Sequence, residues 1–234
     1  RARGLGSRGG APQPHPAVAE PQVTVAVTSR DRAELLTVAL RSVQRQDFES
    51  WECIVVDDAS TDDAVLVAQS FAAVDGRFRV FQHDAPHGPS AARNDALAEA
   101  RAPLICFLDD DDFLLEGSLR ARHEALVDQP VDVAGAFCDW VNVDADAGLE
   151  AFRPARRAPV RRGEISFASL LAGTPFILSA PLLRTSALRA AGGFDEQRTQ
   201  AEDAALWVRL CRAGYRFVDA AHVGIAYRRS AGSL

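Results

Sequence analysis

Four consecutive aspartates, Asp109 to Asp112, directly follow the apolar run Leu104–Leu108. Adjacent like charges are unfavourable unless a positive charge neutralises them. Carboxylate oxygens suit Mg²⁺ and Mn²⁺, which proteins bind through one or two carboxylates together with substrate phosphates. Because alternate side chains of a turn can face one site, the cluster predicts a metal site that uses Asp109 and Asp111. A solvated acidic turn that caps the next helix is the alternative interpretation.

A second acidic pair, Asp57 and Asp58, closes the apolar run Cys53–Val56. One carboxylate of the pair could accept hydrogen bonds from a base or ribose, and the other could cap a helix or hold an arginine. The polar residues up to Asp63 are good N-cap residues, so part of this cluster is expected to be local capping. We favour ligand contact for Asp58 and capping for Asp63.

The common phosphate-binding signatures are absent. The chain contains neither G-x-x-x-x-G-K-[ST] nor G-x-G-x-x-G, and it has no lysine at all, which excludes a P-loop lysine and Schiff-base chemistry. An enzyme that uses a metal ion to hold a diphosphate leaving group is the class that remains.

The elements expected to position these groups alternate between strands and helices. Strands are expected at 23–28, 53–56, 78–82 and 104–108. A first helix is expected to begin at a capping box formed by Asp31 and Glu34, and further helices are expected at 64–73 and 89–100. This alternation predicts an α/β fold with a doubly wound, mostly parallel sheet flanked by helices. Ligands bind beyond the carboxyl ends of such strands. The turn of Thr28, Ser29 and Arg30 should therefore line one crevice with both acidic clusters.

The alternation ends after about residue 129. We expect a strand or hairpin at 133–143, an Arg- and Pro-rich loop at 144–163, helices at 164–172 and 201–213, and strands at 176–183 and 217–227. Residues 1–22 carry no periodicity and are expected to form a flexible leader or linker. One domain is predicted over 23–234, with a nucleotide-binding part at about 23–130 and a smaller mixed acceptor-side part at about 131–234.

Composition sets further bounds. The 234 residues carry 26 basic and 32 acidic side chains, a net charge of −6, which disfavours a nucleic-acid partner. No apolar run reaches the ~20 residues of a transmembrane helix, although peripheral association with a membrane is compatible with the sequence. The four cysteines contain no C-x-x-C pair. They are expected to be buried thiols in a reducing, cytoplasmic setting.

Three segments resemble glycosyltransferase family 2, inverting enzymes of the GT-A fold that use nucleotide-diphospho-sugars. They are VTVAVTSRDRAELLTVALRSVQRQDFESWECIVVDDASTDD, HGPSAARNDALAEARAPLICFLDDDDFLLEGSL and GGFDEQRTQAEDAALWVRLCRAGYRF. The segments cover most of residues 23–227 in the family's order and spacing. The resemblance implies an enzyme that moves a sugar from its donor, with UDP-sugars favoured, to a glycan, lipid-linked or small-molecule acceptor with the help of Mn²⁺ or Mg²⁺.

The resemblance also implies roles for particular residues. Asp203 matches the general base, and Asp111 matches the metal ligand of the D-x-D motif. The amide dipoles of a helix start are expected to keep Asp203 ionised, which lowers its basicity. The remaining matches contact the nucleotide sugar or lie on the acceptor side. The nucleotide-sugar matches are Thr28, Ser29, Arg30, Asp57, Asp58, Arg93, Asp109 and Asp110, and the acceptor-side matches are Asp195, Glu202 and Trp207.

The chain departs from the family at one point. Many relatives carry a histidine after the last strand, whereas Tyr227-Arg228-Arg229 is followed here by Ser230, and the chain stops at Leu234, where relatives usually continue. These departures favour, as an alternative, a catalytically silent sugar-nucleotide-binding domain of a larger polysaccharide-assembly protein. A sugar nucleotidyltransferase is a third hypothesis.

Overall fold

The computed structural model describes residues 20–145, 149, 156–157, 163, 165–170, 177–198 and 200–229. The nineteen residues before them, which include most of the predicted leader, lie outside the described part of the chain. So do Ser230 and most of the predicted loop at 144–163.

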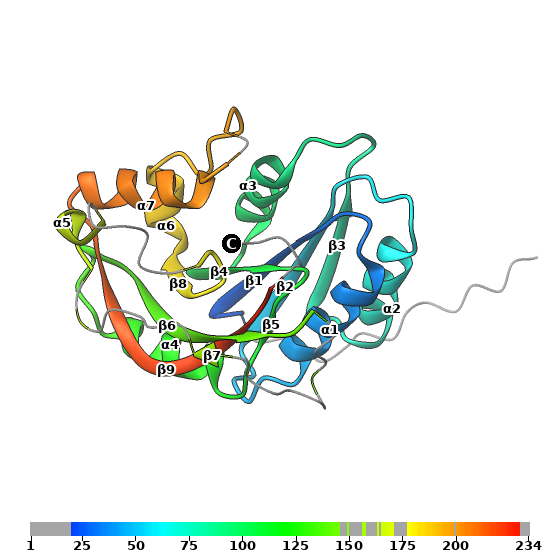
Figure 1. Ribbon diagram of the computed structural model, residues 1–234, viewed down its shortest axis with the longest axis horizontal. Coiled ribbons are helices and arrows are strands. Elements are labelled where there is room, and N and C mark those ends of the chain that lie inside the picture. Colours follow the sequence, from blue (N-terminus) through cyan, green and yellow to red (C-terminus); the bar gives the residue numbers. More distant parts are fainter. Residues whose placement is uncertain are drawn as a thin grey trace, which may run out of the picture.

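The nucleotide-binding part is a parallel sheet with helices on both faces, as predicted (Figure 1). Strand β1 pairs in parallel with β2 and β4, and β2 pairs in parallel with β3, which gives the order β3-β2-β1-β4. All seven residues of β2 are buried, which explains the continuous apolar run at 53–56 within it. The elements in chain order are β1 (Val23–Ser29), α1 (Ala33–Gln44), β2 (Trp51–Asp57), α2 (Ala64–Val74), β3 (Phe78–Gln82), α3 (Pro89–Glu99) and β4 (Leu104–Asp109).

The acceptor-side part continues the same sheet with mixed pairing. Strand β8 pairs antiparallel with β4 and β6, whereas β9 runs parallel to β6 and antiparallel to β5. Of the strand or hairpin predicted at 133–143, the structure has a single strand, and the strands predicted at 217–227 are one strand of thirteen residues. The elements are β5 (Phe113–Leu114), α4 (Ser118–Val127), β6 (Val133–Val143), β7 (Arg156–Arg157), α5 (Phe167–Leu170), β8 (Pro181–Arg184), α6 (Thr185–Ala190), α7 (Glu202–Arg212) and β9 (Arg216–Arg228).

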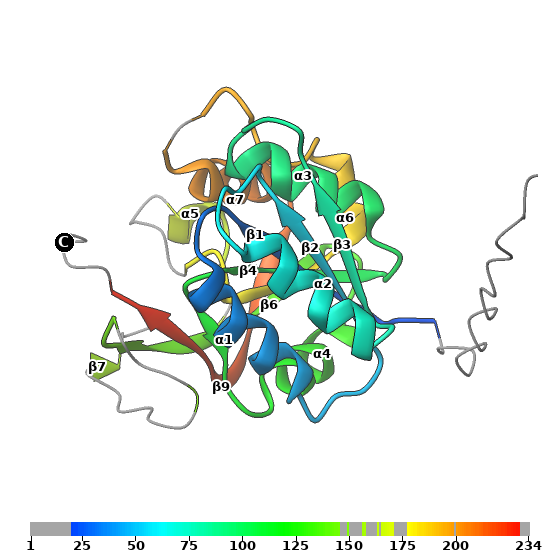
Figure 2. The same ribbon diagram turned by 90° about the vertical axis from the view of Figure 1, so that its right-hand side faces the viewer.

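The core lies on the two faces of this sheet. Alternate residues of β1 point to opposite faces: Val25 and Val27 pack with α1, α2 and α4, and Ala26 packs with α3, α6 and α7. Figure 2 shows α1 and α2 side by side in front of the sheet, with α3 above them. The four cysteines are buried and free, as predicted. Among the described residues, no helix is long and apolar enough to cross a membrane.

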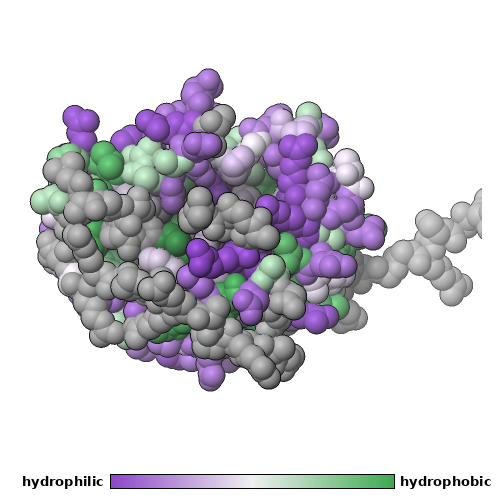
Figure 3. All heavy atoms as spheres, viewed as in Figure 1, coloured by the Kyte–Doolittle hydropathy of each residue, from purple (hydrophilic) through white to green (hydrophobic). Residues whose placement is uncertain are grey.

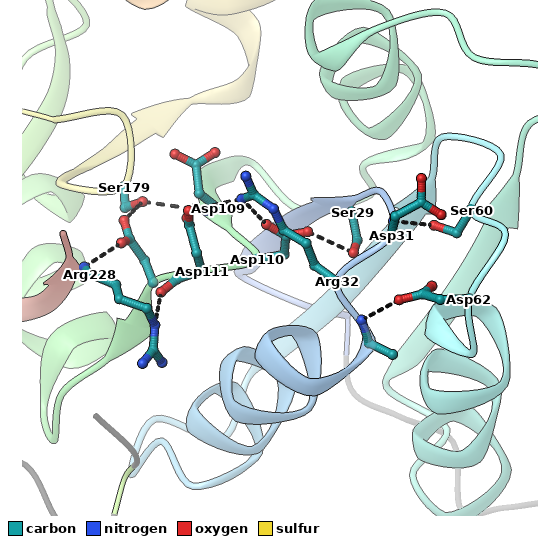
Figure 4. A network of polar contacts seen from close by, with 12 residues as sticks. Ser29, Asp31, Arg32, Ser60, Asp62, Asp109, Asp110, Asp111, Ser179 and Arg228 are labelled. Atoms are coloured by element: carbon teal, nitrogen blue, oxygen red, sulfur yellow. Dashed lines mark hydrogen bonds and ion pairs between the residues drawn. The ribbon is translucent and has the colours of Figure 1, made fainter. Parts of the chain in front are cut away.

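The start of α1 does not use the predicted capping box. Helix α1 begins at Ala33, whose N–H donates to Oδ2 of Asp62 at 2.9 Å, so the cap comes from the loop after β2. Asp31 has a φ of 53° and accepts from the N–H and hydroxyl of Thr61 at 2.6 and 2.9 Å. The prediction of a capping box was wrong, because the capping carboxylate belongs to the loop after β2. The N–H of Asp31 also donates to the hydroxyl of Ser60, so the loops after β1 and β2 hold each other in place (Figure 4).

Candidate active site

A cavity of about 460 Å³ opens at the carboxyl ends of β1, β2 and β4, beside the start of α3. Figure 3 shows hydrophilic residues gathered near the middle of this face and over the side that carries α3. The predicted crevice is therefore present. The residues that line it are Thr28, Ser29, Arg30, Arg32, Asp58, Gly88, Pro89, Ala92, Arg93, Asp109, Asp110 and Asp111.

Asp110 is held by the loop after β1. The hydroxyl of Ser29 donates to its Oδ2 at 2.7 Å, and Nη1 of Arg32 donates to its Oδ1 at 3.1 Å (Figure 4). Burial raises the pKa of Asp110 to about 6, although Ser29 and Arg32 act in the opposite direction. The first and fourth strands are thus joined by side chains at the floor of the cavity.

Asp112 faces away from the cavity and supports the turn from behind. Its side chain accepts from the Ser179 hydroxyl at 2.9 Å and from the N–H of Arg228 at 3.1 Å. Arg228 also donates from Nε to the carbonyl of Asp111 at 2.8 Å. Burial, with the charges of Asp109 and Asp111, raises the pKa of Asp112 well above its usual range. Arg228 therefore holds the aspartate turn in place.

Asp109 and Asp111 fit the donor set of a divalent metal. Both line the cavity, and their side chains are 32% and 31% exposed. Burial, together with the negative charge of Asp109, raises the pKa of Asp111. Within the described residues no group of three or more His, Cys, Asp or Glu converges on one point. Two carboxylates open to a cavity match the way in which Mg²⁺ is bound together with substrate phosphates.

Arg93 projects from α3 between the two parts of the domain. Its Nη2 donates to Oδ1 of Asp109 at 2.9 Å, and its Nη1 donates to Oε1 of Glu202 at 2.6 Å. The residue is 6% exposed and lines the cavity. Its guanidinium, however, is engaged by two carboxylates of the protein.

Asp203 is the second residue of α7 and lies next to Glu202. Burial raises its pKa, and the charges of Glu202 and Asp109 act in the same direction, whereas the N–H of Ala204 and the charge of Arg93 lower it. The sequence predicts that the helix start lowers the basicity of this carboxylate. Burial outweighs that effect, so Asp203 is a stronger proton acceptor than an exposed aspartate.

Asp57 and Asp58, at the end of β2, lie in different environments. Asp57 is 1% exposed, is not among the cavity-lining residues, and accepts from the N–H of Ser60 at 2.9 Å. Asp58 lines the cavity, but its carboxylate also accepts from Nδ1 of His83 at 2.8 Å and from the N–H groups of His87 and Gly88 at 2.7 and 2.9 Å. Asp58 therefore fixes the loop that leads into α3.

The acceptor-side residues are dispersed. Trp207 is fully buried and packs edge-on against Phe217, so it supports α7 from the core. Asp195 lies in a turn outside the main cavity, beside Arg198. Sequence reasoning also missed Asn94, which bonds to both the N–H and the carbonyl of Phe194 and to Glu196, at 2.8, 3.0 and 2.7 Å. Its place directly after Arg93 in SAARN was the available signal.

The model of the family described as "Glycosyl transferase family 2" matches residues 24–178. The chain belongs to glycosyltransferase family 2. It is 40% identical over 100 residues to the GalNAc(5)-diNAcBac-PP-undecaprenol beta-1,3-glucosyltransferase of Campylobacter jejuni, a match that covers 42% of this chain and 32% of that protein. It is 30% identical over 220 residues to the succinoglycan biosynthesis protein ExoU of Rhizobium meliloti, covering 86% of this chain and 60% of that protein.

A solved structure shows the same fold. S. aureus TarS 1-349, in complex with UDP-GlcNAc, superposes with a TM-score of 0.74 at 19% identity, covering 91% of this chain and 60% of that one. The family member described here therefore has the GT-A architecture expected from its sequence. It spans less than two thirds of the length of each of these three proteins.

Proposed function

We propose that this domain is an inverting glycosyltransferase that moves a sugar from a nucleotide-diphospho-sugar to an acceptor hydroxyl. The observation that carries the proposal is the cavity at the strand ends, where Asp109 and Asp111 lie open and Arg93 links Asp109 to Glu202. This link ties the start of α7, where Asp203 follows Glu202, to Asp109 of the cavity, although Asp203 itself is not among the residues that line the cavity.

In the proposed mechanism Asp203 accepts the proton of the acceptor hydroxyl while that oxygen attacks the anomeric carbon from the face opposite the diphosphate. The raised pKa of Asp203 suits this role, because it makes the carboxylate a better base. Asp109 and Asp111 would hold Mn²⁺ or Mg²⁺, and the metal, when bound, stabilises the charge that develops on the leaving diphosphate. The cavity itself contributes by orienting the two substrates.

The donor and acceptor are proposed from the relatives. A UDP-sugar is favoured because the structural neighbour is named as a complex with UDP-GlcNAc. A glycan or lipid-linked acceptor is favoured because one relative is named as a glucosyltransferase acting on a PP-undecaprenol compound, and another as a succinoglycan biosynthesis protein. Four free thiols support a reducing, cytoplasmic location, where peripheral contact with a membrane would bring a lipid-linked acceptor within reach.

The test compares sugar transfer and donor hydrolysis with Mn²⁺ in wild type, Asp203→Asn and Asp111→Asn. Loss of a general base lowers kcat by about 10² to 10⁴. Asp132→Asn is the matched control, because this carboxylate pairs with Arg216 outside the cavity. Turnover of both site variants within a few-fold of the control would contradict the mechanism. Tight nucleotide binding without turnover across many acceptors would favour the silent binding domain instead.

A further inference from the structure

One guanidinium nitrogen already lies among the aspartates of the site. Nη1 of Arg32 is 2.9 Å from Oδ2 of Asp111 and 3.1 Å from Oδ1 of Asp110 (Figure 4). Arg32 immediately precedes α1, so this positive charge comes from the loop after β1 rather than from the turn that carries the aspartates.

Arg32 differs from the other two arginines of the cavity. The side chain of Arg93 is 8% exposed and is fixed between two carboxylates, whereas the side chain of Arg32 is 49% exposed. Arg30 is equally open, at 51%, but its ion pair is a long one, 3.7 Å to Asp31. Arg32 therefore combines direct contact with the aspartates and a side chain that can turn into solvent without opening the core.

A divalent ion on Asp111 conflicts with this contact. Metal coordination requires a carboxylate oxygen, and a guanidinium within hydrogen-bond distance of the same carboxylate would repel the ion at short range. Asp110 would stay in place, because the hydroxyl of Ser29 holds its other oxygen at 2.7 Å. At Asp111 the conflict therefore falls on Arg32, whose half-exposed side chain can turn into solvent. Arg93, which bonds to the other proposed ligand, Asp109, is buried and is also held by Glu202, so it is expected to stay in place.

We propose that Arg32 is an internal counter-cation that a divalent metal ion displaces from Asp111. The inference rests on the proposed function insofar as that function takes Asp109 and Asp111 as metal ligands. It concerns binding of the metal alone, so it is tested without a donor or an acceptor.

The experiment is calorimetric titration of MnCl₂ into nucleotide-free wild type, Arg32→Gln and Arg30→Gln. Both variants remove one positive charge from an arginine of the same cavity, and only Arg32→Gln removes the contact with Asp111. We expect Arg32→Gln to bind Mn²⁺ about three- to ten-fold more tightly than Arg30→Gln, because half-exposed ion pairs are individually of modest strength. Arg32→Lys, which keeps the charge, should bind close to wild type.

Three results would overturn the proposal: equal affinities in the two glutamine variants, weaker binding in Arg32→Gln, or no detectable Mn²⁺ binding by any of the proteins. The double variant Arg32→Gln/Asp111→Asn should lose the added affinity, and a gain that survives Asp111→Asn would place the ion elsewhere and overturn it as well. Turnover is not part of the measurement. A chain that binds Mn²⁺ as expected but transfers no sugar would contradict the proposed function and leave the role of Arg32 supported.

Discussion

Arg93 of α3 and Glu202 of α7 are joined by a hydrogen bond of 2.6 Å, although 109 residues separate them in the chain. The same guanidinium bonds to Asp109 at 2.9 Å. One buried arginine therefore connects the end of β4 in the nucleotide-binding part to the helix that carries Asp203. Because removal of one partner leaves a buried charge uncompensated, this connection has consequences for stability that can be measured apart from activity.

Replacement of Arg93 by Met is expected to lower the free energy of unfolding by about 3 kcal/mol, because Asp109 and Glu202 lose their shared cation. In Arg93→Met/Glu202→Gln the loss should be smaller than the sum of the single losses, with a coupling of about 1–3 kcal/mol. Denaturant unfolding of the four proteins of this cycle measures the coupling.

The control cycle uses Arg120 and Asp47, whose side chains are 47% and 43% exposed at an N–O distance of 2.7 Å. Water screens exposed ion pairs, so the coupling of this pair should be smaller than that of Arg93 and Glu202. A coupling at Arg93 no larger than that of the control would show that the bridge does not join the two parts energetically.

Asn94 is expected to hold the turn that precedes α7. Its amide satisfies both the N–H and the carbonyl of Phe194, so Asn94→Ala leaves two backbone groups without that partner. The expected loss in free energy of unfolding is about 1–3 kcal/mol. Asn94→Asp keeps the acceptor for the N–H of Phe194 but places a charge beside Glu196, so it should be destabilising as well. Chemical denaturation of both variants tests this, and stability equal to wild type would count against the role.

Ser179 is expected to stabilise the aspartate turn from behind. Ser179→Ala removes the 2.9 Å hydrogen bond to Asp112 inside a fully buried site, which should cost about 1–3 kcal/mol of unfolding free energy. Ser186→Ala is the control, because that serine is exposed and lies within α6. A difference between the two variants below about 0.5 kcal/mol would mean that Asp112 is held without the hydroxyl.

The parts of the fold that could be predicted are those in which apolar residues occur at the expected period. The buried runs at 25–27, 53–56 and 104–108 contain no polar residue, so both the strands β1, β2 and β4 and the cavity at their ends followed from the sequence. Helix α4 was missed because its buried face consists of Ser118, Leu119, Arg122 and Leu126. Arg122 is fully buried there and donates to the carbonyls of Ser179 and Ala180. A hydrophobic periodicity cannot predict that a charged residue is buried.

The candidate site divides in the same way. Residues at strand ends, such as Ser29, Asp58 and Asp109, reach the cavity because the backbone alone places them there. Hydrogen bonds between distant side chains could not be predicted. Those of Arg32 with Asp110 and of Arg93 with Glu202 depend on how loops and helices pack. Trp207 shows the reverse case, because the match to the family predicted that it lies on the acceptor side but not that it is fully buried in the core.

Two histidines should respond to pH with opposite signs. Burial lowers the pKa of His83, but the hydrogen bonds of its two ring nitrogens to Asp58 and Asp95, at 2.8 and 2.7 Å, outweigh burial and raise the pKa above 6.5. Burial lowers the pKa of His123, which packs against Phe48 with ring centroids 4.8 Å apart.

A raised folded-state pKa means that the native state holds its proton more tightly than the unfolded chain. The stabilisation from His83 is therefore complete below 6.5 and is lost as the pH rises through the folded-state pKa. For His123 the native state favours the neutral ring, so stability falls as the pH drops through 6.5 toward the lowered pKa.

We expect the difference in unfolding free energy between wild type and His83→Gln to shrink from about pH 5.5 to about pH 9, and the difference between wild type and His123→Gln to grow over the same range. Denaturant titrations across this range check both slopes. Parallel slopes for the two variants would show that the carboxylates at His83 do not outweigh its burial.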